Sequence, residues 1–406
     1  MKRKDLVPTQ FVRTFGTQTS SYTCMSHPGI DFDEVLAMWL IYLFATLEWL
    51  KSNSQNGTIY LGVDGDGQRG VFNEHRARDI GGDQTKCSAI LVARSLGLEH
   101  DPILQPLLQY ALGQDVSGTG SKFDLAAALK AWRSVCWNNE EAIRWTFRGL
   151  DVWYEHAQYS TLHPHIWNQV AGGMLDFGRL GLLGGPNYID WTNRGVYLFS
   201  ELDRLTAAAI VYVKNTAEPH TVQIGTRRIT YWIVRSRADQ EFRGCVVSAF
   251  RRLGVSAELF INVEDSGHFQ VFVPKNPSLL EETFKGITHR IFRNKKWITP
   301  EILTKSFLEQ MDWVRHKQEG REEAWEKWLY LHPGISCIFN GSQTARPDPL
   351  IGDDFALSDL VEIAEAAIIR RNPLPAAPRR PTSAPARRTS PAQPAPQPTS
   401  TTSQQK

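Results

Sequence analysis

The most constraining stretch of the sequence is the apolar segment Val35–Leu50, which follows a short polar run directly. The segment spans 16 residues and contains Glu48, so a buried helix fits it better than a membrane span does. The polar run holds His27, Asp31 and Asp33. Two carboxylates this close repel each other unless a cation lies between them. We therefore expect the run to form one wall of a metal site.

Length and composition indicate a globular protein of two domains with a tail. The chain has 406 residues, of which 42% are hydrophobic and 22% charged, as in ordinary globular proteins. We predict a first domain over 1–205, a smaller α/β domain over 206–345, a terminal helical segment over 346–371, and a disordered tail over 372–406 that is rich in Pro, Ala, Ser, Thr and Arg. The tail contributes +5 to the formal net charge of +2, which leaves −3 for the rest. A near-neutral body argues against broad electrostatic wrapping of DNA or RNA.

Cysteine usage and the N-terminus bear on the compartment. The five cysteines are odd in number and widely spaced, which indicates neither a disulfide framework nor a zinc knuckle and fits a reducing compartment. The first residues are basic but lack the apolar stretch of a secretory signal. We therefore expect a cytoplasmic protein that does not enter the membrane.

Alternating strand-like and helix-like segments predict an α/β fold with a mostly parallel, helix-covered sheet. We expect residues 1–20 to be irregular, and Asp33 to be the N-cap of a single helix over 33–51. The other expected strands cover 22–25, 58–63, 70–73, 226–236, 257–263 and 268–273, and the other expected helices cover 81–96, 103–112, 123–158, 201–214, 242–253, 279–292, 300–330 and 355–371. Ligands of such sheets bind beyond the carboxyl ends of the strands. The side chains that follow predicted strands are those of His27, Asp31, Asp64 and His75.

The candidate ligands are oxygen and imidazole groups, which suit Mn²⁺ or Mg²⁺ rather than a thiolate-bound metal. Asp64 begins the run Asp-Gly-Asp-Gly, where an acid at the tip of a buried strand can bridge two ions. Asp-Gly is also a strong hairpin signal. In the same way, Asp31 and Asp33 can be ordinary helix-capping acids, so each motif alone leaves a structural alternative open.

The order of the motifs is informative. His-Pro-Gly-x-Asp-x-Asp-Glu-x-Leu-Ala from His27 is followed by Val-Asp-x-x-Gly, by Asn73-Glu74-His75, by Thr-Lys-x-Ser-Ala over 85–89, and by Asp115. This order resembles the DHH phosphoesterase superfamily and, within it, the melanocyte-proliferating-gene exonuclease family. The resemblance covers about residues 20–120. It departs from the superfamily at the triplet, where Asn73 stands in place of Asp and Glu74 in place of the first His.

The resemblance implies a metal-dependent phosphodiesterase, a 3′–5′ exonuclease on RNA or short oligonucleotides, with two Mn²⁺ (or Mg²⁺) ions. The implied metal ligands are His27, Asp31, Asp33, Asp64, Glu74 and Asp115. Asp64, which would bridge the ions, and His75, which would face the phosphate, are the implied catalytic residues. The candidate substrate contacts are His75, Arg76, His268 in a Ser-Gly-His loop, and Arg293 in a basic turn.

Two other functions stay open. The changed triplet is compatible with an inactive DHH fold that serves as a binding or scaffold protein. The modest charge of the body is compatible with a hydrolase of a small phosphate compound, such as pyrophosphate or a cyclic dinucleotide. The basic tail is a candidate segment for recruiting a protein partner.

Overall fold

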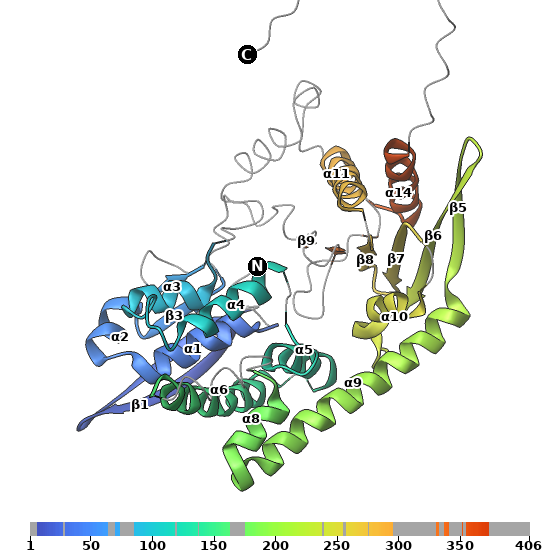
Figure 1. Cartoon of the computed structure of the whole chain (residues 1–406). Coiled ribbons are helices and arrows are strands. Elements are labelled where there is room, and N and C mark those ends of the chain that lie inside the picture. The colour runs from blue at the N-terminus through green and yellow to red at the C-terminus, as the bar shows by residue number, and fades with distance from the viewer. Residues whose placement is uncertain are drawn as a thin grey trace, which may run out of the picture.

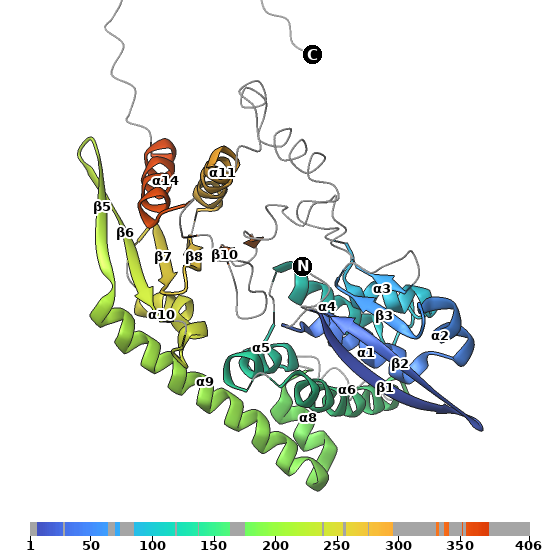
Figure 2. The same cartoon turned by 180° about the vertical axis from the view of Figure 1, so that it is seen from behind.

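The chain folds into a mixed α/β structure with two separate sheets (Figures 1 and 2). The computed structural model describes residues 6–26, 29–63, 70–73, 85–117, 120–136, 138–162, 175–237, 239–254, 257–274, 276–294, 330–332, 337–340, 351 and 355–372. No helix within these ranges is long and apolar enough to cross a membrane. The predicted disordered tail lies outside them, except for Asn372, and so does the predicted helix over 300–330, except for Tyr330.

The first sheet has four strands in the order β1-β2-β3-β4. Their bounds are β1 Val7–Phe15, β2 Gln18–Ser26, β3 Thr58–Leu61 and β4 Val71–Phe72. β1 pairs with β2 in antiparallel register, whereas β2, β3 and β4 are parallel. The prediction that residues 1–20 are irregular is wrong. β1 forms the edge of the sheet, and its Phe11 ring stacks on Tyr22 of β2 with centroids 5.3 Å apart.

Helix α1 (Phe32–Phe44) lies at the centre of the first hydrophobic core, and every residue over 32–41 is buried. Its N-cap is Asp31 rather than the predicted Asp33. At its other end, the Arg13 guanidinium donates hydrogen bonds to the carbonyl oxygens of Ile41, Leu43 and Ala45, at 3.2, 2.9 and 2.6 Å. A strand residue therefore satisfies the carbonyl groups that the end of a helix leaves without partners.

The single helix predicted over 33–51 is in fact two helices. α1 ends at Phe44, and α2 (Leu47–Asn53) begins after Thr46. Thr46 is the N-cap of α2, because its Oγ1 accepts a hydrogen bond from the Trp49 backbone N–H at 3.1 Å. A threonine that bonds the backbone in this way starts a new helix instead of continuing the old one.

Helices complete the first core. Their bounds are α3 Ser88–Ser95, α4 Gln105–Ser117, α5 Leu125–Val135, α6 Asn139–Leu162, α8 Phe177–Gly184 and the 3-10 helix η2 Gly185–Tyr188. α6 is joined to the following helix α9 (Ile189–Thr216) by a pair of tryptophans. The Trp145 and Trp191 rings stack with centroids 4.5 Å apart, and each indole N–H donates to the backbone carbonyl of the other residue, at 2.9 and 2.7 Å.

Helix α9 runs from the first core to the second sheet (Figure 1). It has 28 residues, so it is roughly 42 Å long. Leu198 belongs to the first core, whereas Leu205, Ala209 and Val213 pack against the second sheet. One continuous helix thus contributes to both cores.

The second sheet has six strands in the order β5-β6-β7-β8-β10-β9 and is antiparallel except for the β6–β7 pair. Its elements are β5 Glu218–Ile224, β6 Arg227–Ser236, η3 Arg243–Cys245, α10 Val246–Leu253, β7 Leu259–Glu264, β8 Phe269–Phe272, α11 Pro277–Asn294, β9 Tyr330–His332, β10 Cys337–Asn340 and α14 Leu357–Arg371. The overall class is α/β as predicted, but this sheet is mostly antiparallel.

Helices cover both faces of the second sheet. On β7, Ile261 and Val263 face α11 and α14, whereas Phe260 faces α9 and α10, because successive strand residues point to opposite faces. Figures 1 and 2 show α11 and α14 side by side on their face. α14, predicted as part of a terminal segment over 346–371, therefore belongs to the core of the second sheet. The predicted domain limits stay predictions.

One of the five cysteines differs from the other four in its exposure to solvent. Cys24, Cys87, Cys245 and Cys337 are buried, whereas Cys136 is partly exposed. Burial raises the pKa of the Cys337 thiol to about 12 and raises the pKa of the Cys24, Cys245 and Cys136 thiols as well, although the nearby Arg194 guanidinium opposes the shift at Cys136. Reaction with a maleimide needs both thiolate formation and access of the reagent, and Cys136 is the cysteine with access.

We expect only Cys136 to react rapidly with a maleimide at pH 8 in the folded protein, and all five thiols to react after unfolding. The raised thiol pKa values in the folded state contribute stability at neutral pH. That contribution is lost as the pH rises above the unfolded value of about 8.5. The free energy of unfolding, measured with urea, should therefore fall between pH 8 and pH 10. Cys136→Ala is the control and should keep most of this fall, because the buried Cys24, Cys245 and Cys337 thiols remain. Labelling of several thiols in the folded protein would contradict the packing.

Candidate functional site

Three parallel strands bring their carboxyl ends to one edge of the first sheet. Met25 pairs with Tyr60, and Leu61 pairs with Phe72, so the last residues of β2, β3 and β4 form a row. The polar side chains at this edge are almost completely buried. Five of them form what we call the sheet-edge cluster: Ser26, Asp33, Glu34, Asn73 and Ser88, with exposed fractions of 0, 4, 1, 6 and 0%.

Asp33 links the start of α1 to the start of α3. Its Oδ2 accepts a hydrogen bond from the Ser88 backbone N–H at 3.1 Å, and Ser88 is the first residue of α3. The Ser88 hydroxyl in turn donates to the Phe72 carbonyl oxygen at the end of β4, at 3.2 Å. The positive end of the α3 dipole stabilises the Asp33 carboxylate, so this acid has a structural partner inside the protein.

Glu34 lies against the end of β3. Its Oε2 accepts a hydrogen bond from the Asp31 backbone N–H at 2.9 Å, which is one half of a capping box. Its Oε1 lies 2.6 Å from the position that a Cβ of residue 62 would take. Residue 62 is glycine with a φ of +63°, and only glycine leaves room for this carboxylate. Two adjacent acids are therefore enclosed where the strands end.

Ser26 is the last residue of β2 and the cluster member nearest to His27 in the chain. Its side chain is fully buried, and its Oγ has no hydrogen-bond partner among the described atoms. A buried hydroxyl without a partner is costly. The Ser26 hydroxyl is therefore a group that a bound polar ligand or ion at this edge could stabilise.

Asp31 is arranged differently from its neighbours. Its side chain is 43% exposed, and its Oδ1 lies 2.7 Å from Nη2 of Arg133 in the last turn of α5. The other terminal nitrogen, Nη1, donates to the Gly29 carbonyl oxygen at 3.2 Å. Arg133 thus holds the segment between β2 and α1 at two points.

The donor chemistry fits a hard divalent cation only in part. Asp33 and Glu34 supply buried carboxylate oxygens, which Mn²⁺ and Mg²⁺ prefer, and Ser26 adds an orphaned hydroxyl. Within the described ranges, however, no group of three or more His, Cys, Asp or Glu side chains is arranged to hold a metal ion. A complete ligand set would need residues from the loops that follow the strands.

Several predicted site residues lie outside the described residues. These are His27, Asp64, Glu74, His75 and Arg76. In the chain, His27 comes directly after β2, Asp64 three residues after β3, and Glu74 two residues after β4. Asp115 was expected after a helix that ends at residue 112, but it lies inside α4, which continues to Ser117.

The other two predicted contacts belong to the second sheet and its helices. His268 directly precedes β8, and its Nδ1 lies 2.9 Å from the Ser266 hydroxyl. Ser266 also donates to Oε2 of Glu264 at 3.2 Å. These contacts fit the β-turn between β7 and β8, which was the structural alternative for this loop. Arg293 is exposed near the end of α11.

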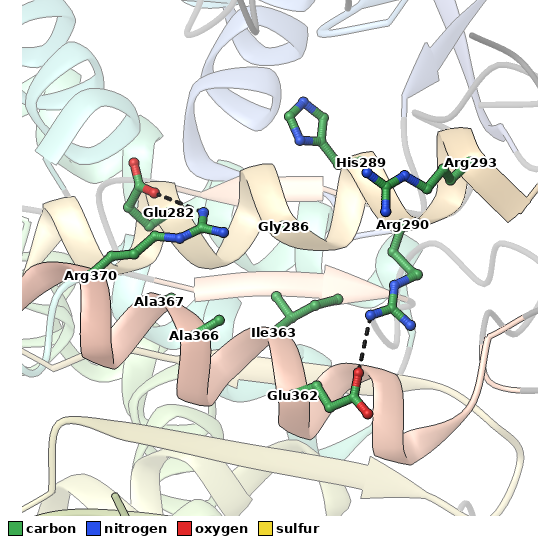
Figure 3. A pocket seen from close by; sticks show the side chains of 10 residues that line it. All are labelled: Glu282, Gly286, His289, Arg290, Arg293, Glu362, Ile363, Ala366, Ala367 and Arg370. Carbon is green, nitrogen blue, oxygen red and sulfur yellow. Dashed lines mark hydrogen bonds and ion pairs between the residues drawn. The ribbon is translucent and has the colours of Figure 1, made fainter. Parts of the chain in front are cut away.

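A groove of about 350 Å³ lies between α11 and α14, with Arg293 on its wall (Figure 3). Its other charged groups are paired across the two helices. Arg290 pairs with Glu362 at 3.1 Å, and Arg370 pairs with Glu282 at 3.6 Å. Figure 3 shows these pairs closing the groove near its two ends. These ion pairs connect α11 to α14, so the charged residues have a structural role that requires no ligand.

Some residues of this site were not singled out in the sequence. Glu34 had a local signal, since an acid three residues after an N-cap Asp is the pattern of a capping box. Ser88 lies in the Thr-Lys-x-Ser-Ala run, which was used only for the resemblance. Arg133 had no local signal, because it lies 102 residues from Asp31 in the chain.

Comparison with known proteins gives no relative for this chain. No protein-family model matches it, and neither a curated protein nor a solved structure does. The resemblance to the DHH superfamily therefore rests on the motifs themselves.

The contact between Glu34 and Gly62 predicts unequal effects for two glycine substitutions. Gly62 and Gly16 both have positive φ, +63° and +60°, but a Cβ at residue 16 would meet nothing within 4 Å. Gly16→Ala should lower the free energy of unfolding by about 1 kcal/mol through backbone strain alone. Gly62→Ala should lower it by about 1–3 kcal/mol more, because Glu34 must give up its hydrogen bond to Asp31. Equal losses in urea unfolding would show that Glu34 does not lie against Gly62.

Proposed function

We propose that the protein is a divalent-metal-dependent phosphoesterase with its site at the carboxyl ends of β2, β3 and β4. One observation carries the proposal. Asp33 and Glu34, adjacent in the chain, are 4% and 1% exposed at the edge where such sheets bind ligands. Burying two carboxylates is costly unless positive charge compensates them. The α3 N-terminus stabilises Asp33, and a divalent cation bound at this edge would interact favourably with both carboxylates.

The resemblance assigns roles to the remaining residues. His27, Asp31, Asp33, Asp64, Glu74 and Asp115 would hold two Mn²⁺ or Mg²⁺ ions, with Asp64 between them. Bound cations lower the pKa of a coordinated water and so supply the nucleophile for attack on phosphorus. His75 would stabilise charge on the phosphoryl oxygens. Arg76, His268 and Arg293 would contact the substrate.

The proposed substrate is the 3′ end of RNA or a short oligonucleotide. A small phosphate compound, such as pyrophosphate or a cyclic dinucleotide, is the alternative within the same chemistry. The charge of −3 outside the tail, which follows from the composition, favours local recognition of a phosphate over wrapping of a long polyanion. The basic tail is proposed as a segment that recruits a protein partner.

A binding or scaffold protein on the same fold is the second candidate, and one observation favours it. Asp31 is neutralised by Arg133, and Asp33 accepts the Ser88 N–H. Two of the proposed ligands thus have protein partners that do not require a metal. A test of function must therefore separate hydrolysis from folding.

The decisive experiment is to incubate the purified protein with end-labelled RNA, a cyclic dinucleotide and pyrophosphate, each with Mn²⁺ and with EDTA. We expect Mn²⁺-dependent cleavage of RNA. Asp64→Asn should lower the rate by at least about 100-fold, because it removes a ligand shared by both ions. Asp66→Asn, two positions further along the chain, is the matched control and should keep the rate. No cleavage of any substrate would favour the scaffold function, and full activity of Asp64→Asn would remove Asp64 from the mechanism.

The tail should be dispensable for catalysis. Asn372 closes α14, since its backbone N–H and its Nδ2 both donate to the Ile368 carbonyl oxygen, at 3.1 and 3.0 Å. Deletion of 373–406 should therefore leave kcat/KM and the free energy of unfolding unchanged. Deletion of 372–406, which also removes this cap, should lower the free energy of unfolding by about 1 kcal/mol. A large loss of kcat/KM in the shorter deletion would give the tail a role in the reaction.

A further inference from the structure

Arg133 connects a distant helix to the segment that leads into the sheet-edge cluster. Its two terminal nitrogens reach two points of this segment, the Gly29 carbonyl oxygen at 3.2 Å and Oδ1 of Asp31 at 2.7 Å. Between these points, the Ile30 side chain is 1% exposed and packs into the first core. The segment is therefore held from inside by Ile30 and from α5 by one guanidinium.

The helix that carries Arg133 is itself held from two sides. Val135, two residues further along in the last turn of α5, packs against both the first core and the core between α9, α10 and the second sheet. Leu202 of α9 does the same. The guanidinium thus extends from a point where the two cores meet, and it ends on Asp31.

We propose that Arg133 is a positioning residue for the metal site. It fixes the Gly29–Asp31 segment, and through it the Asp31 carboxylate and the first turn of α1. The inference deepens the proposed function and rests on it, because its effect on metal affinity requires that Asp31 or its neighbours bind a cation. Carboxylates that bind metals are themselves held by hydrogen bonds, and loss of such a partner commonly weakens metal affinity 10–100-fold.

The exposure of Arg133 and Asp31 indicates that their ion pair orders the local segment rather than stabilising the whole fold. The side chains are 22% exposed for Arg133 and 43% for Asp31. Ion pairs of this kind contribute little to overall stability. What the pair supplies is geometry, since a planar guanidinium holds two acceptors at once and a lysine ammonium presents a single point charge. Arg133→Lys therefore keeps the charge and loses the two-point contact.

The first measurement is Mn²⁺ affinity by isothermal titration calorimetry on the full chain. We expect Arg133→Met to raise the Mn²⁺ dissociation constant about 10–100-fold, and Arg133→Lys to recover only part of the loss. Arg144→Met is the matched control, because Arg144 forms an exposed pair with Glu140 on α6. It should leave the constant within twofold of the parent. An Arg133→Met protein that binds Mn²⁺ like the parent would overturn the proposal, and so would full rescue by lysine.

A double-mutant cycle tests whether Arg133 acts through Asp31. If it does, Arg133→Met combined with Asp31→Asn should bind Mn²⁺ no more weakly than Asp31→Asn alone, because residues in one network are not additive. Fully additive losses would mean that Arg133 affects the metal by another route, and would overturn the assignment as a positioning residue.

Hydrogen exchange separates failure of this inference from failure of the proposed function. Without metal, Arg133→Met should speed amide exchange over residues 29–36, while the second sheet keeps its protection. Arg133→Lys preserves more of the packing and should give the same pattern. If the parent protein binds no Mn²⁺, the proposed function fails, and faster exchange over 29–36 would still support the positioning of the segment. Unchanged exchange over 29–36 would overturn the positioning whether or not Mn²⁺ binds.

Discussion

Helix α1 is buried on all sides over residues 32–41, and the surrounding structure depends on this burial. A buried helix cannot leave the backbone groups at its ends to water. At the start of α1, the Glu34 carboxylate accepts the Asp31 N–H. At its end, Arg13 of β1 donates to three carbonyl oxygens. The edge strand β1 is thus needed to complete a helix that lies elsewhere in the chain.

The same burial carries two carboxylates into the interior. Asp33 and Glu34 lie in the first turn of α1, so they are enclosed together with the helix. The α3 N-terminus and the space above Gly62 accommodate them. These two partners come from separate parts of the chain, so the packing of the sheet and its helices encloses both acids at the carboxyl edge. That collection of charge is the physical basis for proposing a cation there.

The second sheet is organised by a different constraint. It is covered by helices on both faces, and α9 supplies one of these covers while also contributing to the first core. A continuous helix of roughly 42 Å makes the connection stiff along its length. Arg133 lies close to this connection, in the turn that contains Val135. The geometry of the acidic edge and the junction of the two cores are therefore physically linked by one side chain.

Local periodicity was enough to locate many elements in the sequence. The strand expected over 226–236 is Arg227–Ser236, and the helices expected over 279–292 and 355–371 are Pro277–Asn294 and Leu357–Arg371. The strand buries alternate residues and the helices bury one apolar face, so neighbouring positions in the sequence are enough to predict them. β1 was missed because an edge strand of mixed residues is stabilised by backbone pairing with β2. The break at Ala45–Thr46 was missed because Arg13 completes α1 from a strand.

For the candidate site, the sequence by itself determined the acids at the head of a buried helix, since polar residues followed by a long apolar run can be read directly. Only the tertiary structure decided what these acids contact. Ser88 reaches Asp33 across 55 positions and Arg133 reaches Asp31 across 102. Contacts of such separation leave no periodic trace in a single sequence, because they arise only when the sheet and its helices pack together.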